Sequence, residues 1–185
     1  MATLDRSDGD GAQGAAVATA VWAPPRPALV VPIDFAHLDL FEVQVLQEFG
    51  GPQLRAAIEL ISPANKDRPS HRQAFAIKCA SYLQRGVCVI IVDVVSERVA
   101  NLHADVLEAL RLTSGPAWRP PANLYAVAYR TAVSNGQDCL EAWPEPLSVS
   151  AVLPTVPLWL DIDLCLPMNL EESYMATCES LRVRV

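Results

Sequence analysis

The sequence lacks the markers of several common functional classes. Its five cysteines include no Cys-x-x-Cys pair, and the chain has no glycine-rich phosphate loop, no Gly-x-Ser-x-Gly segment and no internal repeat. These absences remove the sequence evidence for a zinc knuckle, a dithiol redox motif, a nucleotide phosphate loop and a serine-hydrolase elbow. No apolar run reaches the length of a membrane span. The odd number of widely spread cysteines is typical of reduced, mostly buried thiols, and we therefore expect a cytoplasmic protein without a membrane partner.

Positive charge is also scarce. The chain carries 14 Lys and Arg against 21 Asp and Glu, which gives a formal net charge of -7. This balance disfavours a broad basic surface for nucleic acid. A nucleic-acid partner would therefore need a local basic groove, for which the candidates are Lys66, Arg68, Arg72 and Lys78.

The composition predicts one folded domain after a leader. The chain has 185 residues, of which 51% are hydrophobic, enough for one proper core. Residues 1–28 are rich in Ala, Gly and Asp and end in an Ala-Pro-Pro-Arg-Pro run, so we expect a disordered leader there. Its Ala/Gly tract is too short and too weakly apolar for a signal peptide. Residues 29–185 are expected to form a single α/β domain.

A β-hairpin is predicted from residues 40–47 and 54–62, because Gly50-Gly51-Pro52 separates two strand-like segments. If the loop is symmetric about Gly50-Gly51, two residues face each other when their numbers sum to 101. This register places Glu42 opposite Glu59. Directly opposed side chains have Cβ atoms about 5 Å apart. Two carboxylates at that distance repel unless a cation lies between them, and a divalent metal is the simplest solution. A one-residue slip would turn Glu42 to the other face.

A helix is predicted over residues 70–85, with Ser70 as its N-cap and Gly86 just past its end. Lys78 falls on the flank of the apolar stripe, beside Tyr82. From there its ammonium group can either extend into solvent or turn inward to a site. The stripe itself consists of Phe75, Cys79, Tyr82 and Leu83.

Two carboxylates occur within apolar strand segments. Residues 87–95 form an almost continuous apolar run, typical of a central strand, whose one charge is Asp93. A buried carboxylate needs a cation, a metal or a hydrogen-bond network, and the same holds for Glu59. The alternative is a purely structural role for each acid: Asp93 would hydrogen-bond a loop at its strand end, and Glu59 would be neutralised by Lys66 or Arg55.

The rest of the chain is expected to complete an α/β domain with a central mixed sheet flanked by helices. Asn135-Gly136 is a hairpin-type dipeptide, and prolines 144, 146, 154 and 157 confine the following segment to a sheet edge or an extended wrap. The predicted elements are a helix at 101–112, a proline-rich connection at 115–121, strands at 124–131 and 140–143, and a last helix at 170–181.

The chain resembles the bacterial family called domain of unknown function 4058. The resemblance begins with Ile58-Glu59-Leu60-Ile61-Ser62-Pro63-Ala64-Asn65-Lys66 and continues with Lys78, eight residues before Gly86-Val87, and with Asp93. Later segments, among them Glu141-Ala142-Trp143-Pro144 and Leu153-Pro154-Thr155-Val156-Pro157-Leu158, follow the order of that family. The resemblance covers roughly residues 38–174.

The same framework resembles the Uma-two group of predicted endonucleases, which have the PD-(D/E)xK, or restriction-endonuclease-like, fold. That resemblance implies a core in which two acids and a lysine surround magnesium, or manganese, and hydrolyse phosphodiesters with a metal-activated water. Glu59 matches the strand acid and metal ligand, and Lys78 matches a catalytic lysine that has moved onto the helix. Glu42 is the candidate for the second metal ligand. The supporting residues would be Asn65, Lys66, Tyr82 and Asp93.

The chain departs from the standard nuclease motif at two points. Ile61 stands where the motif carries its lysine, and no Pro-Asp pair precedes Glu59. These departures, the acidic charge and the Trp/Pro-rich C-terminal half favour an alternative, a catalytically inactive interaction or assembly module that forms a homodimer. Convergence of Glu42, Glu59 and Lys78 in one wet pocket would favour the enzyme, and an exposed apolar face would favour the module.

Overall fold

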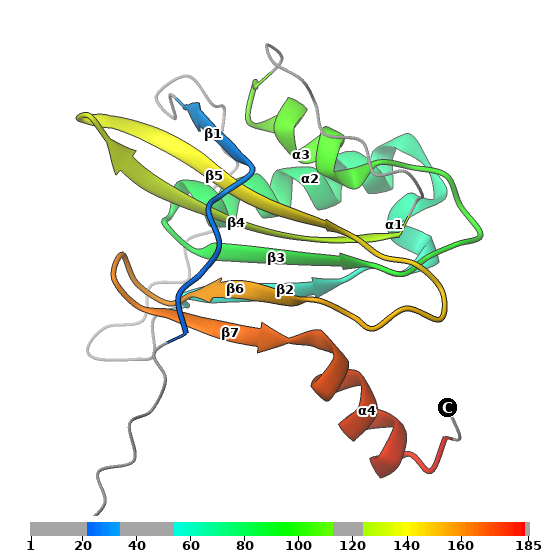
Figure 1. Ribbon diagram of the computed structural model, residues 1–185. Helices are drawn as coiled ribbons and strands as arrows, with labels where there is room; N and C mark the ends of the chain where they lie inside the picture. Colours follow the sequence, from blue (N-terminus) through cyan, green and yellow to red (C-terminus); the bar gives the residue numbers. More distant parts are fainter. Residues whose placement is uncertain (1–21, 34–53, 113–123, 184–185) are drawn as a thin grey trace, which may run out of the picture.

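The computed structural model describes residues 22–33, 54–112 and 124–183. In these residues a five-stranded sheet has the order β1-β5-β4-β3-β2, and a separate two-stranded sheet pairs β6 with β7 (Figure 1). The elements are β1 (Leu29–Pro32), β2 (Ala56–Leu60), α1 (Pro63–Asp67), α2 (Pro69–Gln84), β3 (Cys88–Asp93), α3 (Leu102–Ala109), β4 (Tyr125–Ser134), β5 (Gln137–Pro146), β6 (Thr155–Trp159), β7 (Cys165–Asn169) and α4 (Leu170–Ser180).

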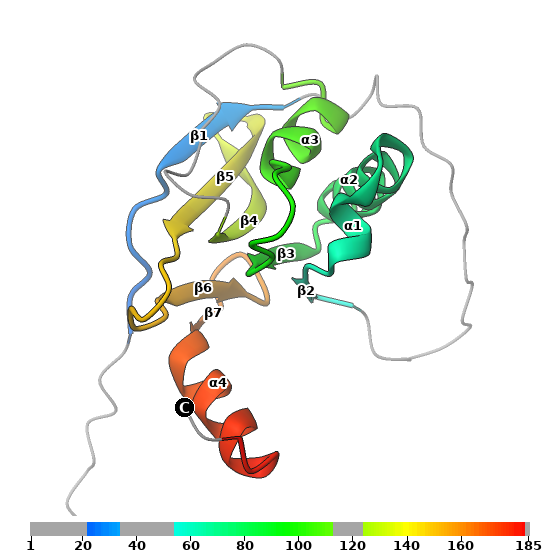
Figure 2. The same ribbon diagram turned by 90° about the vertical axis from the view of Figure 1, so that its right-hand side faces the viewer.

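The larger sheet is mixed, as the sequence predicts. Strands β2 and β3 are parallel, whereas β3–β4, β4–β5 and β5–β1 are antiparallel. Helices α1, α2 and α3 cover one face, and the β6–β7 pair lies against the other (Figure 2). The chain is therefore an α/β protein in which helices flank one face of the sheet, while a strand pair occupies much of the second face.

The alternation in β4 explains the two cores. Tyr125, Val127 and Tyr129 point into the core beneath the helices, whereas Ala126 and Ala128 point into the smaller core beneath β6. Large side chains on one face and alanines on the other allow the β6–β7 pair to approach closely. β4 is thus the middle strand of the five. The predicted central strand, β3, is an interior strand one place nearer the edge.

The hairpin between β4 and β5 turns at the predicted dipeptide. Asn135 and Gly136 both have positive φ, 52° and 75°, and join the paired residues Ser134 and Gln137. This left-handed geometry matches the twist of a two-residue hairpin loop. Pro144 and Pro146 extend β5 beyond the end of β1, so no ladder partner on that side needs their missing N–H.

Prolines also face each other in the smaller sheet. Pro157 of β6 and Pro167 of β7 are direct partners in the antiparallel register. Since neither residue can donate a backbone hydrogen bond, they occupy a position of the ladder in which the partners exchange none. Helix α4 follows directly from β7 and extends away from both sheets (Figures 1 and 2).

The helix predicted at Ser70 begins earlier, and a short helix precedes it. α2 starts at Pro69, with Arg68 as its N-cap in an extended conformation (φ −143°, ψ 158°). A residue before proline is excluded from helical geometry, and proline itself suits the first helical position. The same logic places Ser62 before Pro63 at the start of α1. The Ser62-Pro63 pair therefore starts α1, and the Arg68-Pro69 pair separates it from α2.

The last residues of the predicted leader contact the sheet. The backbone N–H of Ala28 donates to the carbonyl of Ala142 at 2.9 Å, and the indole N–H of Trp143 donates to the carbonyl of Pro25 at 2.8 Å. Residues 1–21 lie outside the described residues, as do the predicted strand at 40–47 and Glu42. None of the helices in the described ranges has both the length and the hydrophobicity needed to cross a bilayer.

Gly86 closes α2 and permits a direct prediction. It has φ +72°, its N–H bonds the carbonyl of Leu83, and the N–H of Val87 bonds the carbonyl of Tyr82, which together form a Schellman motif. A Cβ at this position would meet no atom within 4 Å, so the cost of a side chain is purely conformational. We expect Gly86→Ala to lower the free energy of unfolding by about 1 kcal/mol. Gly86→Asn should lower the free energy of unfolding by less than Gly86→Ala does. Urea denaturation measures both values, and equal losses in the two variants would contradict this account.

Candidate functional site

Glu59 and Lys78 meet across the gap between β2 and α2. The Nζ atom of Lys78 lies 2.8 Å from Oε2 of Glu59, and the side chains are 45% and 19% exposed, respectively. Burial lowers the pKa of Lys78, but the hydrogen bond and negative charge of Glu59 more than offset this, so that this pKa is raised. The helix lysine thus turns inward and remains protonated, and it is Lys78 rather than Lys66 or Arg55 that neutralises Glu59.

A groove of about 330 Å³ opens beside the lysine. Its floor is partly aromatic, and the ammonium of Lys78 lies 5.4 Å from the centroid of the Phe75 ring. His71, which the sequence motif did not single out, also lines the groove. Its spacing of seven residues from Lys78 could have indicated this, because seven residues make about two helical turns. The lining consists of Ala64, Asn65, His71, Ala74, Phe75 and Lys78.

Asn65 and Tyr82, two of the predicted supporting residues, have local roles in the structure. The side-chain oxygen of Asn65 accepts hydrogen bonds from the backbone N–H and the hydroxyl of Ser62, both at 2.9 Å, and so holds the first turn of α1. Tyr82 lies one turn after Lys78 and packs against the helix-side core. The guanidinium of Arg85 lies 5.9 Å from the centroid of the Tyr82 ring.

Asp93 and Lys66 form a second ion pair, which is fully buried. The Nζ of Lys66 lies 2.8 Å from Oδ2 of Asp93, and both side chains are 0% exposed. Lys66 also donates to the carbonyl of Val95 at 3.2 Å, while Oδ1 of Asp93 accepts from the backbone N–H of Val95 at 3.1 Å. Asp93 therefore bonds the loop at the end of β3, and the ammonium of Lys66 is sealed from any ligand in solution.

A buried polar network continues from this pair. Burial raises the pKa of Asp93, and contacts with Lys66, the Val95 amide and Tyr125 partly oppose that rise. The hydroxyl of Tyr125 accepts from the backbone N–H of His103 at 3.1 Å, and Nδ1 of His103 is in hydrogen-bond contact with the hydroxyl of Tyr129. Burial lowers the pKa of His103 to about 4, so its ring is neutral at pH 7. These groups stabilise the helix-side core and are closed to solvent.

The proposed basic groove is neutralised by acids. Arg68 lies 3.5 Å from a carboxylate oxygen of Asp67, and Arg72 lies 3.3 Å from Asp105. With Lys66 paired to Asp93 and Lys78 to Glu59, each of the four candidate cations has a carboxylate partner. Any phosphate that binds here therefore competes with an existing ion pair.

The described residues do not by themselves make a complete metal site. Among them, no three His, Cys, Asp or Glu side chains gather closely enough to hold an ion. Asp93 shares the helix-side face with Glu59, because Glu59 pairs with Ile91 and Asp93 lies two residues further along β3. Its carboxylate, however, is sealed with Lys66. Glu59 therefore contributes one accessible carboxylate, and Glu42, the second predicted ligand, lies outside the described ranges.

Comparison of the chain with protein-family models, with curated proteins and with solved structures finds no match to any of them. The function must therefore be argued from the geometry of these two ion pairs and their surroundings.

The buried pair allows a prediction for stability. Lys66→Met leaves the carboxylate of Asp93 buried without its cation, and we expect the free energy of unfolding at pH 7 to fall by about 3–5 kcal/mol. The loss should shrink as the pH is lowered, because removing Lys66 raises the pKa of Asp93 further and a protonated carboxyl needs no cation.

The direction of this pH dependence follows from the linkage between protonation of Asp93 and folding. An acid whose pKa is raised on folding stabilises the fold below its ordinary pKa, and that contribution is lost as the pH rises through the folded-state value. Urea denaturation between pH 4 and 8 measures the effect. The double variant Lys66→Met/Asp93→Asn is the control and should recover most of the stability at pH 7. A deficit of Lys66→Met that does not change with pH would contradict a charge-based cause.

Proposed function

We propose that this protein is a metal-dependent nuclease of the PD-(D/E)xK type, with Glu59 and Lys78 in its reactive centre. The observation that carries the proposal is the 2.8 Å contact between a strand carboxylate and a helix ammonium, both partly exposed, in which the lysine also lines a groove. If the catalytic lysine of the motif has moved from the strand to the helix, it must still lie next to the strand acid, and Lys78 does so. The mixed sheet with helices over its acid-bearing face supports the same fold.

The chemistry of the two residues suits phosphodiester hydrolysis. The raised pKa of Lys78 keeps its ammonium charged at neutral pH, so it serves to hold a phosphate oxygen and to offset developing negative charge, and not as a general base. The carboxylate of Glu59 is a hard oxygen ligand of the kind that magnesium or manganese prefers. A bound divalent ion would supply activation of the attacking water. Glu42 remains the proposed second ligand.

Binding of substrate must exchange one ion pair for another. Lys78 is held by Glu59 in the structure, so a phosphate can engage it fully only when the charge of Glu59 is shared with a second cation. The proposal therefore ties substrate binding to metal binding: without a divalent ion, Glu59 repels the phosphate. Nucleic acid is the proposed substrate, and its affinity should depend on the metal more than on the overall charge of the surface.

The test combines metal titration with cleavage. Calorimetry with magnesium and manganese should show binding to the unmodified protein, no binding to Glu59→Gln, and retained binding to Lys78→Ala. Cleavage of single- or double-stranded DNA should be abolished in Glu59→Gln and fall by about 10²–10³-fold in Lys78→Ala, the usual range for loss of one transition-state donor. Metal binding that survives Glu59→Gln would refute the assigned role.

Loss of activity in these variants should not reflect unfolding. Partly exposed ion pairs contribute about 1 kcal/mol or less, so both variants should keep nearly the full thermal stability. The matched control is Asp161→Asn, which breaks the ion pair of Asp161 with Arg55, whose charged atoms lie 4.0 Å apart and whose residues do not line the groove. This variant should bind metal and cleave DNA like the unmodified protein.

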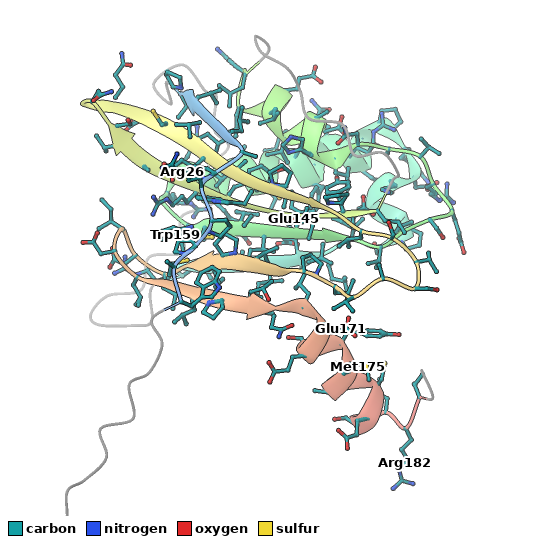
Figure 3. All side chains as sticks on the ribbon, viewed as in Figure 1. Arg26, Glu145, Trp159, Glu171, Met175 and Arg182 are labelled. Carbon is teal, nitrogen blue, oxygen red and sulfur yellow. The ribbon has the colours of Figure 1, made fainter. Side chains whose placement is uncertain are left out.

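A second candidate function, an assembly module, is favoured by helix α4. The helix extends away from the sheets, and Figure 3 shows Met175 and Arg182 along this projecting part. Its exposed apolar side chains, together with those of the turn that follows, are Tyr174, Met175, Leu181 and Val183. Large apolar side chains gathered on a projecting helix are typical of a surface that a second copy covers.

Molar mass separates this candidate from a monomeric enzyme. If α4 mediates a homodimer, light scattering should give twice the chain mass, and Met175→Lys should shift the protein toward the monomer by placing a charge in the contact. Ala176→Lys adds the same charge about 200° around the helix from Tyr174 and should leave the dimer intact. A monomer at all concentrations would rule out this surface as a dimer contact.

A further inference from the structure

The segment that precedes β1 is rich in proline and continues from that strand toward the β6–β7 pair (Figures 1 and 2). Residues 22–28, here called the strap, have the sequence Trp-Ala-Pro-Pro-Arg-Pro-Ala. Each residue from 23 to 27 is a proline or precedes one, so steric clashes exclude helical geometry over nearly all of this stretch. The structure has neither helix nor turn at residues 22–27. The strap therefore has the extended, left-handed polyproline II geometry, with three residues per turn.

The strap is held by a side chain and not by a β-ladder. Ala28 bonds the backbone of β5 through Ala142, but within the described ranges the backbone of residues 22–27 makes no hydrogen bond to another backbone group. Instead, the indole N–H of Trp143 donates to the carbonyl of Pro25 at 2.8 Å. A segment whose prolines have carbonyl acceptors but no N–H donors suits such a contact.

One side of the strap faces the protein. Pro24 and Pro27 are half-buried, whereas Ala23, Pro25 and Arg26 are exposed. Because a polyproline II segment has three residues per turn, Pro24 and Pro27 lie on the same side. The strap thus directs two prolines toward the protein and leaves the charge of Arg26 in solvent.

The surface that receives the strap is aromatic. The ring centroids of Trp143 and Trp159 lie 5.9 Å apart, and the guanidinium carbon of Arg130 lies 3.5 Å from the centroid of Trp159. The charge of Arg130 is in turn paired with Glu141 at 2.5 Å. Trp159 also lines a cleft of about 320 Å³. Aromatic surfaces of this kind are the usual docking sites for proline-rich segments in polyproline II geometry.

We propose that Trp143, with Trp159 beside it, forms a recognition site for proline-rich segments, and that the strap occupies this site within its own chain. A proline-rich segment of a partner protein offers the same carbonyl acceptors and the same spacing of prolines, and it binds by displacing the strap. Release of residues 22–27 leaves the pairing of β1 with β5 intact, because that ladder begins after them. The site lies on the second face of the sheet and is independent of the Glu59–Lys78 proposal.

The test uses the ¹⁵N-labelled full chain and a peptide with the sequence of residues 22–28. In the variant Pro24→Ser/Pro27→Ser the strap should dissociate, which moves the indole N–H signal of Trp143, and the added peptide should restore the original signal. The unmodified chain should bind the peptide about tenfold more weakly, because a tethered competitor has an effective concentration in the millimolar range. A control peptide with serine in place of both prolines should leave the signal of the variant unchanged.

Two further measurements test the indole itself. Hydrogen exchange of the Trp143 indole N–H should be slower in the unmodified chain than in Pro24→Ser/Pro27→Ser. Adding Trp143→Phe to that variant removes the donor but keeps an aromatic ring, and it should weaken peptide binding at least tenfold. If Trp143→Phe folds poorly, the two peptides still decide the question. No effect of the peptide on the variant, equal effects of both peptides, or equal exchange rates would overturn the proposal.

Discussion

The buried ion pair between Lys66 and Asp93 is the contact on which the helix-covered side of the sheet depends. It links α1 to the end of β3, and both partners also hold the loop at Val95, because Oδ1 of Asp93 accepts from the Val95 amide and the Lys66 ammonium donates to the Val95 carbonyl. Because α1 leads directly into α2, the position of Lys66 also limits where α2 can lie over the sheet. The 2.8 Å contact of Lys78 with Glu59 then follows from a helix that is already anchored one element earlier.

The two ion pairs have the same chemistry and differ in burial. Both join a strand carboxylate to a helix lysine at 2.8 Å, and both carboxylates lie on the same face of the sheet. One pair is sealed and linked to Tyr125, His103 and Tyr129 through hydrogen bonds. The other is partly exposed, and its lysine lines a groove. The sealed pair fixes a geometry, whereas the exposed pair is the one that we propose exchanges its partner for a ligand.

The sequence predicts most of the elements but not their pairing. The apolar run of β3, the alternation of β4 and the Asn135-Gly136 turn are local signals, and each leads to the element found. The first turn of α2 differs by one residue because proline excludes helical geometry at Arg68. The sequence also indicates that Glu59 and Asp93 need partners. It does not say which lysine serves which acid, since that depends on how α1 and α2 lie over the sheet.

The cleft that Arg55, Cys88 and Trp159 line, at the N-terminal ends of β2 and β3, cannot be predicted from the sequence for the same reason. Its residues come from the end of α2, the starts of β2 and β3, strands β4 and β5, and β6 with the turn that follows, and they form no local motif. Only the packing of β6 and β7 on the second face brings Trp159 to Arg130. That packing in turn requires Ala126 and Ala128, whose small size carries no functional signal in the sequence.

The facing prolines of β6 and β7 limit how this molecule can aggregate. In a pair that exchanges no hydrogen bonds, the backbone groups of Pro157 and Pro167 point to the outer edges of the two strands. Each edge therefore lacks a donor at its centre, where an incoming β-strand would need one. Pro157 is buried and Pro167 is exposed, so this gap in the donors faces solvent on β7. Addition of a strand to β7 is disfavoured at that position.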